Sequence, residues 1–184
     1  MKGKPAVFLD RDGTLIVEVN YLSTLKALQL YAGAAGAVKE INNLKLPAIL
    51  ATNQSGIGRG MFTLKTLDAI HAKIQRLLKT GAKAKLDAIY YCPHLPEDYC
   101  KCRKPALGMV KLAKKALNID PKNSYFIGDK ETDIEFGRNA GGKTILVLTG
   151  YGKDSVIKMK EKPDFIAEDL CAAVNWIKED YLKK

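Results

Sequence analysis

Two aspartates stand at the end of a short apolar run near the N-terminus. Residues 7–9 (Val-Phe-Leu) predict a buried strand, and Asp10 and Asp12 follow it on either side of Arg11. Side chains two apart on an extended strand point the same way, so we expect Asp10 and Asp12 to project together and Arg11 to point elsewhere. Two adjacent carboxylates repel each other unless a cation or a shared proton lies between them. The pattern favours a Mg²⁺ site with one aspartate free to attack an electrophile, against the alternative of an acidic turn.

Further polar residues follow other apolar runs that are typical of strands. Residues 52–56 (Thr-Asn-Gln-Ser-Gly) offer hydroxyl, amide and backbone N–H groups that suit an oxyanion, although turns often contain them too. Asp129 would complete the metal site, and Asp133 would support it or be an ordinary acid at a helix start. Arg103 and Lys104 precede another helix, where a lysine offsets negative charge and a guanidinium binds phosphate. Ligands bind at such strand ends, so the pattern indicates phosphate chemistry.

A cluster of thiol and imidazole groups lies in the middle of the chain. Its four members are Cys92, His94, Cys100 and Cys102. Three thiolates and one imidazole make a complete tetrahedral set for Zn²⁺, and such a closed site stabilises structure and leaves no position for a reactive water. The loop at 92–104 has little apolar content and would depend on the ion for its order. The alternative, a redox pair of Cys100 and Cys102, gives the other two donors no role.

Strand-like and helix-like segments alternate along the chain. Strands are expected at 6–9, 47–51, 86–91, 124–127 and 144–148, a short element at 165–166, and helices at 33–46, 63–81, after Pro105 and at 170–182. This alternation predicts a parallel, Rossmann-like sheet with helices on both faces, in one domain spanning residues 1–184. Residues 15–30 fit neither pattern and are expected to form a flap over the aspartate pair. Cys171 and His71 stand alone on predicted helices and are interpreted as structural.

The composition and the net charge of the chain limit the classes of protein to which it can belong. With 184 residues, 47% of them hydrophobic and 27% charged, the chain is typical of one globular domain. No apolar run is long enough to span a bilayer and no secretory signal is recognisable, so we expect a cytoplasmic protein. The net charge of +10 would suit nucleic acid or a small anion. The lysines are scattered, and the acidic strand ends argue against a groove for a phosphate backbone.

Four blocks of residues, in order along the chain, resemble the motifs of the haloacid dehalogenase-like phosphatases. The blocks are 10–14 (Asp-Arg-Asp-Gly-Thr), 52–54 (Thr-Asn-Gln), Lys104, and Gly128-Asp129 with Asp133. The loop at 92–104 narrows the resemblance to the small, capless branch of histidinol phosphatases and heptose bisphosphatases. The resemblance covers about residues 5–152. It implies a capless α/β fold with a zinc-binding loop.

The resemblance also implies roles for matching positions. Asp10 is the expected nucleophile that forms an aspartyl-phosphate, and Asp12 the acid that protonates the leaving oxygen and then activates water. Mg²⁺ is expected on the Asp10 carboxylate, the Asp12 backbone carbonyl and Asp129, with Thr52 and Lys104 on the phosphoryl oxygens. The residues expected to bind the rest of the substrate are Glu18, Val19, Asn20, Tyr21, Asn53, Gln54, Ser55, Arg103 and Lys130. Arg103 and Lys130 are expected to help recognise the substrate, including its distal phosphate.

Two features indicate different substrates within this branch. The loop between His94 and Cys100 is short, as in the histidinol phosphatases, whereas Ser55 and Arg59-Gly60 favour the heptose bisphosphatases. We expect hydrolysis of the 7-phosphate of a heptose 1,7-bisphosphate, in lipopolysaccharide or other surface-sugar synthesis. Histidinol phosphate is the alternative substrate, and a basic zinc-containing nucleic-acid binder or a nucleic-acid 3′-phosphatase is the alternative class. The expected partner is a small sugar phosphate, with no nucleic acid or membrane, and the expected state is a monomer.

Overall fold

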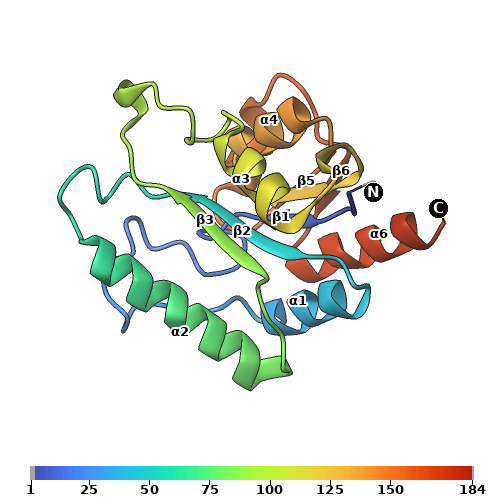
Figure 1. Cartoon of the computed structure of the whole chain (residues 1–184), viewed down its shortest axis with the longest axis horizontal. Helices are drawn as coiled ribbons and strands as arrows, with labels where there is room; N and C mark the ends of the chain where they lie inside the picture. Colours follow the sequence, from blue (N-terminus) through green and yellow to red (C-terminus); the bar gives the residue numbers. More distant parts are fainter. Residues whose placement is uncertain (1–2, 184) are drawn as a thin grey trace.

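A single parallel sheet organises the chain in the computed structural model, which describes residues 3–183 (Figure 1). The strands are β1 (Val7–Leu9), β2 (Ala48–Asn53), β3 (Ala88–Cys92), β4 (Tyr125–Gly128), β5 (Lys143–Val147) and β6 (Phe165–Ala167), in the order β3-β2-β1-β4-β5-β6. The helices are α1 (Ala34–Asn43), α2 (Leu64–Ala82), α3 (Gly108–Leu117), α4 (Glu131–Ala140), α5 (Gly152–Lys158) and α6 (Leu170–Leu182), with 3₁₀ turns at Pro96–Asp98 and Pro121–Asn123. The predicted parallel α/β architecture is confirmed.

The helices cover both faces of the sheet. Helices α1, α2 and α6 lie on one face and α3 and α4 on the other (Figure 1). Along the central strand β1, Val7 and Leu9 belong to the first apolar cluster, whereas Phe8 belongs to the second and stacks on Phe126 with ring centroids 4.6 Å apart. Such two-sided burial explains why the strand sequences are almost continuously apolar. No helix among residues 3–183 is long and apolar enough to cross a bilayer.

The strand order places a switch point between β1 and β4. The chain runs from β1 outward to β2 and β3, then returns to the other side of β1 with β4. Connections leave in opposite directions on the two sides of this point, so a crevice opens beyond the carboxyl ends of these strands. The segments after β1, β2 and β4 carry the predicted phosphate chemistry, and the topology therefore gathers them at one edge.

The ends of several elements differ from the sequence prediction. Thr63 caps α2 as expected, with its hydroxyl accepting the Thr66 N–H at 3.2 Å. Gly81 does not stop this helix, which continues to Ala82 and ends at a left-handed Lys83. A side chain at Gly81 would meet Ala35 of α1, so this glycine permits close packing of the two helices. Helix α5 was not predicted.

The predicted flap has a buried base. Strand β1 ends at Leu9, and Ile16 then forms isolated bridges with Asp12 and Leu30. Leu15, Ile16 and Leu22 are buried, while residues 18–21 between them are half-buried or exposed. The flap is therefore anchored in the core and presents its tip at the crevice.

Candidate active site

A cavity of about 940 Å³ opens at the carboxyl edge of the sheet. All four predicted catalytic residues line it, namely Asp10, Asp12, Thr52 and Lys104. So do most of the predicted substrate residues, which are Glu18, Asn20, Tyr21, Asn53, Gln54, Ser55, Arg103 and Lys130. Val19 is not among the lining residues and is 38% exposed. One pocket thus combines the polar strand ends, the flap and part of the cysteine loop.

Three buried carboxylates converge around one lysine at the base of this cavity. Oxygen atoms of Asp10, Asp129 and Asp133 lie within 4.8 Å of one another. Lys104 Nζ donates to Asp10 Oδ1 at 2.7 Å and to Asp133 Oδ1 at 2.5 Å. Burial alone would lower the pKa of Lys104, but the charges of Asp10 and Asp133 raise it. The lysine is therefore held as a cation beside Asp10.

Asp129 has the features of a cation ligand. It is fully buried, and burial raises its pKa to about 8, with a further contribution from the charge of Asp10. Its Oδ2 accepts the Tyr151 N–H at 2.8 Å, while its Oδ1 has no hydrogen-bond partner among the described residues. Gly13 and Gly150 leave room for this carboxylate, since a Cβ at either position would collide with it. An unpaired buried oxygen among hard carboxylate ligands fits a magnesium ion.

The Asp12 carboxylate does not join the other three. Asp10 and Asp12 both line the cavity, as expected, but the Asp12 carboxylate is not in the group of oxygen atoms that lie within 4.8 Å of one another. Arg11 binds the Asp12 carboxylate through Nε at 3.0 Å, and Gln54 Nε2 donates to it at 2.8 Å. Arg11 is almost fully buried. Asp12 is thus oriented separately from the cluster that fits a metal.

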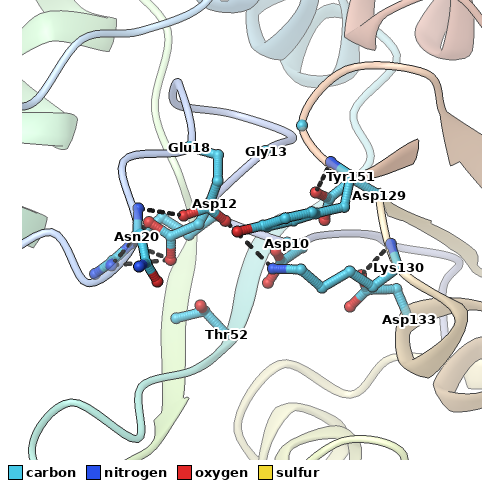
Figure 2. Close-up of polar contacts among 12 residues, drawn as sticks. Asp10, Asp12, Gly13, Glu18, Asn20, Thr52, Asp129, Lys130, Asp133 and Tyr151 are labelled. Atoms are coloured by element: carbon cyan, nitrogen blue, oxygen red, sulfur yellow. Dashed lines mark hydrogen bonds and ion pairs between the residues drawn. The ribbon is translucent and has the colours of Figure 1, made fainter. Parts of the chain in front are cut away.

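The flap and two strand-end loops meet at the mouth of the cavity. Lys130 Nζ lies 3.3 Å from Glu18 Oε2 and 4.6 Å from the centroid of the Tyr151 ring. Figure 2 shows the Tyr151 side chain reaching from the β5–α5 loop toward Glu18, with Lys130 beside it. Burial would lower the pKa of Lys130, but the charges of Asp129, Asp10 and Glu18 raise it. The ammonium therefore stays charged among several carboxylates.

The cysteine loop brings its predicted ligands together. Cys92, His94, Cys100 and Cys102 each offer one atom within 4.8 Å of the others. His94 Nδ1 lies 3.2 Å from Cys102 Sγ, and Cys92 Sγ lies 3.4 Å from Cys100 Sγ. Burial disfavours the Cys100 thiolate, but the N–H groups of Arg103 and Cys102 outweigh it and lower its pKa to about 7. Soft donors in this arrangement fit a tetrahedral metal ion.

Comparison with known proteins places this site in a family. Residues 101–173 match the family model described as HAD-hydrolase-like. A D-glycero-D-manno-heptose-1,7-bisphosphate 7-phosphatase from Thermosynechococcus vestitus is 45% identical over 95% of both chains. A D-glycero-beta-D-manno-heptose-1,7-bisphosphate 7-phosphatase from Haemophilus ducreyi is 39% identical, over 95% of this chain and 99% of that one. The chain belongs to the heptose-1,7-bisphosphate 7-phosphatase family.

A solved structure agrees with this assignment. The D,D-heptose 1,7-bisphosphate phosphatase from B. bronchiseptica, complexed with magnesium and phosphate, superposes with a TM-score of 0.89. The two are 31% identical, with 96% of this chain and 99% of that chain covered. These comparisons confirm the predicted resemblance to the haloacid dehalogenase-like phosphatases. As a member of this family, the protein is a phosphoric monoester hydrolase.

The sequence analysis did not predict the residues on one side of the cavity. Tyr151 lines the cavity, and Gly150 gives space to Asp129, yet neither was predicted. Both lie in the loop after the fifth strand, so the rule that ligands bind beyond carboxyl strand ends would have indicated them. The role of Asp133 was left open, whereas its contact with Lys104 required the three-dimensional structure.

Proposed function

We propose that this chain hydrolyses the 7-phosphate of D-glycero-D-manno-heptose 1,7-bisphosphate. The observation that carries the proposal is the Asp10 carboxylate paired with a buried Lys104 in a cavity of about 940 Å³. The names of the relatives from T. vestitus and H. ducreyi, and of the solved structure from B. bronchiseptica, support the choice of sugar. The corresponding cellular setting is a cytoplasmic, monomeric enzyme of surface-sugar synthesis.

The proposed chemistry begins at Asp10. One of its carboxylate oxygens bonds to phosphorus while the bond from phosphorus to the sugar oxygen breaks, and Asp12 gives its proton to that oxygen. A water molecule then loses a proton to Asp12 and attacks phosphorus, which releases phosphate and frees Asp10. Arg11 and Gln54 fix the Asp12 carboxylate for both transfers. Lys104 and Thr52 would neutralise and orient the phosphoryl oxygens, as phosphoryl transfer requires.

The carboxylate cluster would hold Mg²⁺. Asp10 and Asp129 would supply side-chain oxygens and Asp12 its backbone carbonyl, while Asp133 would hold Lys104 in place. The unpaired Asp129 Oδ1 supports this assignment. When bound, the ion neutralises charge on the transferring phosphoryl group.

The cysteine loop would hold Zn²⁺ in a structural role. All four donors come from the protein, so no ligand position is left for a reacting water. The loop also carries Arg103, whose Nη1 donates to the His94 carbonyl at 3.3 Å and whose side chain lines the cavity. The ion would thus position one of the basic residues assigned to the substrate.

The remaining lining residues suit a sugar that carries a second phosphate. Arg103 and Lys130 offer positive charge, while the flap and the β2 loop offer carboxylate, amide and hydroxyl groups for sugar hydroxyls. These contributions would come from Glu18, Asn20, Tyr21, Asn53, Gln54 and Ser55. Val19 does not line the cavity and is left out of the proposed substrate contacts.

Phosphate release with a substrate panel tests the proposal. The panel holds both anomers of heptose 1,7-bisphosphate, histidinol phosphate and a 3′-phosphorylated oligonucleotide, each with and without Mg²⁺, and Asp10→Asn serves as the blank. We expect kcat/KM to be highest for a heptose bisphosphate, and ³¹P NMR to show that the 1-phosphate remains. Higher kcat/KM for histidinol phosphate or for the oligonucleotide would overturn the proposal.

A further inference from the structure

Lys130 is held from three sides at the mouth of the cavity. Its side chain is 40% exposed, its Nζ is 3.3 Å from Glu18 Oε2, and the centroid of the Tyr151 ring is 4.6 Å away. Its backbone N–H donates to Asp133 Oδ2 at 3.1 Å, which fixes the start of the side chain. A lysine has many rotamers, so these contacts restrict where its charge lies. Glu18 is in turn held by the Asn20 N–H at 2.8 Å.

The Tyr151 backbone is itself rigidly placed. Its N–H donates to Asp129 Oδ2 at 2.8 Å, and the preceding Gly150 N–H donates to the Tyr31 hydroxyl at 3.1 Å. Thr149 Oγ1 donates to the Gly13 carbonyl at 2.6 Å. The loop after β5 is therefore tied both to the carboxylate cluster and to the segment after β1. An aromatic ring on such a support forms a fixed surface, and here it lies beside Lys130 (Figure 2).

We infer that Tyr151 is a positioning residue that holds the Lys130 ammonium at the cavity mouth, where it meets the anionic part of the substrate. The inference rests on the proposed function, because it assigns the distal charge of the sugar bisphosphate to Lys130. The face of an aromatic ring attracts a cation, and the effect grows as water is excluded. Among residues 3–183, Glu18 is the carboxylate in ion-pair contact with Lys130, while Asp129 and Asp10 act on its charge from farther away. A partly exposed ion pair restrains a long side chain weakly.

The test compares Tyr151→Leu with Tyr151→Phe, because phenylalanine keeps the ring and leucine removes it. For heptose 1,7-bisphosphate we expect Tyr151→Leu to raise KM about 5-fold, the order of one partly exposed cation–π contact, while Tyr151→Phe stays within about 2-fold of wild type. Repeating Tyr151→Leu in a Lys130→Met background shows whether Tyr151 acts through Lys130. We expect no further rise in KM there; an additional rise would mean that Tyr151 contacts the substrate itself and would overturn the inference.

A chemical readout makes the inference independent of the sugar. Trace acetylation with acetic anhydride, followed by peptide mass spectrometry, measures the reactivity of Lys130 against the exposed Lys111 in the same molecule. We expect a several-fold rise for Lys130 in Tyr151→Leu and none in Tyr151→Phe. Equal labelling in all three proteins would refute the positioning role even if heptose bisphosphate is the substrate. If wild type fails to hydrolyse heptose bisphosphate, the proposed function fails while this labelling still decides the role of Tyr151.

Discussion

The carboxylate cluster and the cysteine loop are both suited to a metal, but the protein supports them in different ways. Asp10, Asp129 and Asp133 are buried at the ends of central strands, and Lys104 supplies a positive charge among them. The cysteine loop begins at Cys92, the buried last residue of β3, and then leaves the sheet toward Tyr99, which is 92% exposed. The first site is thus held by the core and by an internal cation, whereas the second has no opposite charge among its donors and is joined to the β2 loop through Cys92, Pro93 and Lys104.

Because of this difference, we expect one site to determine the reaction and the other to determine the stability of the fold. An internal lysine lets the carboxylate cluster persist without an ion, so an ion there is free to serve the reaction. Of the four donors only Cys92 is buried, and the other three lie on half-buried or exposed positions, so an ion there would contribute folding free energy. We therefore expect changes in the first site to alter turnover, and changes in the second to alter unfolding.

Asp10→Asn gives the largest expected effect on turnover. Amide and carboxylate have nearly the same shape, and Lys104 keeps Asp133 as a partner, so the fold and the metal content of the cysteine loop should persist. Without a nucleophile, kcat should fall by at least ~10⁴-fold. Steady-state phosphate release, with circular dichroism and zinc analysis as controls, checks this. Turnover near that of wild type would remove Asp10 from the nucleophile role.

Cys100→Ser should produce the opposite profile. Loss of one of the four donors should abolish stoichiometric zinc and lower the midpoint of thermal unfolding by at least ~5 °C. The value of kcat, measured well below that midpoint, should change by less than about 3-fold, because Cys100 lines the cavity without an assigned role in phosphoryl transfer. Cys171→Ser, at a cysteine outside the cluster, is the matched control. A zinc-free wild-type protein with unchanged unfolding would contradict the structural role.

His71 should have a smaller effect, which is on the free energy of unfolding and depends on pH. It is buried on α2, and burial together with the charge of Arg11 lowers its pKa from 6.5 to about 4. His71 therefore binds a proton more readily in the unfolded chain than in the folded one. Above pH 6.5 this difference does not change the free energy of unfolding, and as the pH falls from 6.5 toward 4 it lowers that free energy. The shift corresponds to about 3 kcal/mol.

Denaturant titrations of wild type and His71→Leu at pH 7 and pH 4.5 measure this effect. We expect the gap in unfolding free energy between the two proteins to widen in favour of the variant at the lower pH. Protonation of the cysteine-loop ligands contributes equally to both proteins and cancels in the comparison. A gap that does not change with pH would mean that burial and the charge of Arg11 do not lower the pKa of His71 in the folded protein.

Much of the fold was predictable because the strands and helices are specified locally. Helix α6 matches its predicted range, and α2 begins after the predicted cap Thr63. Gly81 was misread as a helix end, because its close contact with α1 depends on tertiary packing. The short α5 has no long apolar stripe and escaped a search for periodicity.

The candidate site was predictable where residue type alone indicates chemistry. The four donors of the cysteine loop and the polar strand ends were identified, and the structure brings them together. The partners of the Asp12 carboxylate were not predictable, because its contact with Gln54 joins residues that are far apart in the sequence. Tyr151 was missed because an aromatic residue in a loop carries no motif; its place after a strand was a signal, but its contact with Lys130 required the structure.

Selective removal and return of the two metals is the most direct test of the proposed division between the sites. Turnover of heptose 1,7-bisphosphate and the midpoint of thermal unfolding would be measured on the same samples after chelation, after Mg²⁺ return and after Zn²⁺ return. We predict that Mg²⁺ controls turnover with little change in the unfolding midpoint, and that Zn²⁺ controls the midpoint without replacing Mg²⁺ in turnover. Restoration of turnover by Zn²⁺ alone, or full turnover without Mg²⁺, would contradict the account.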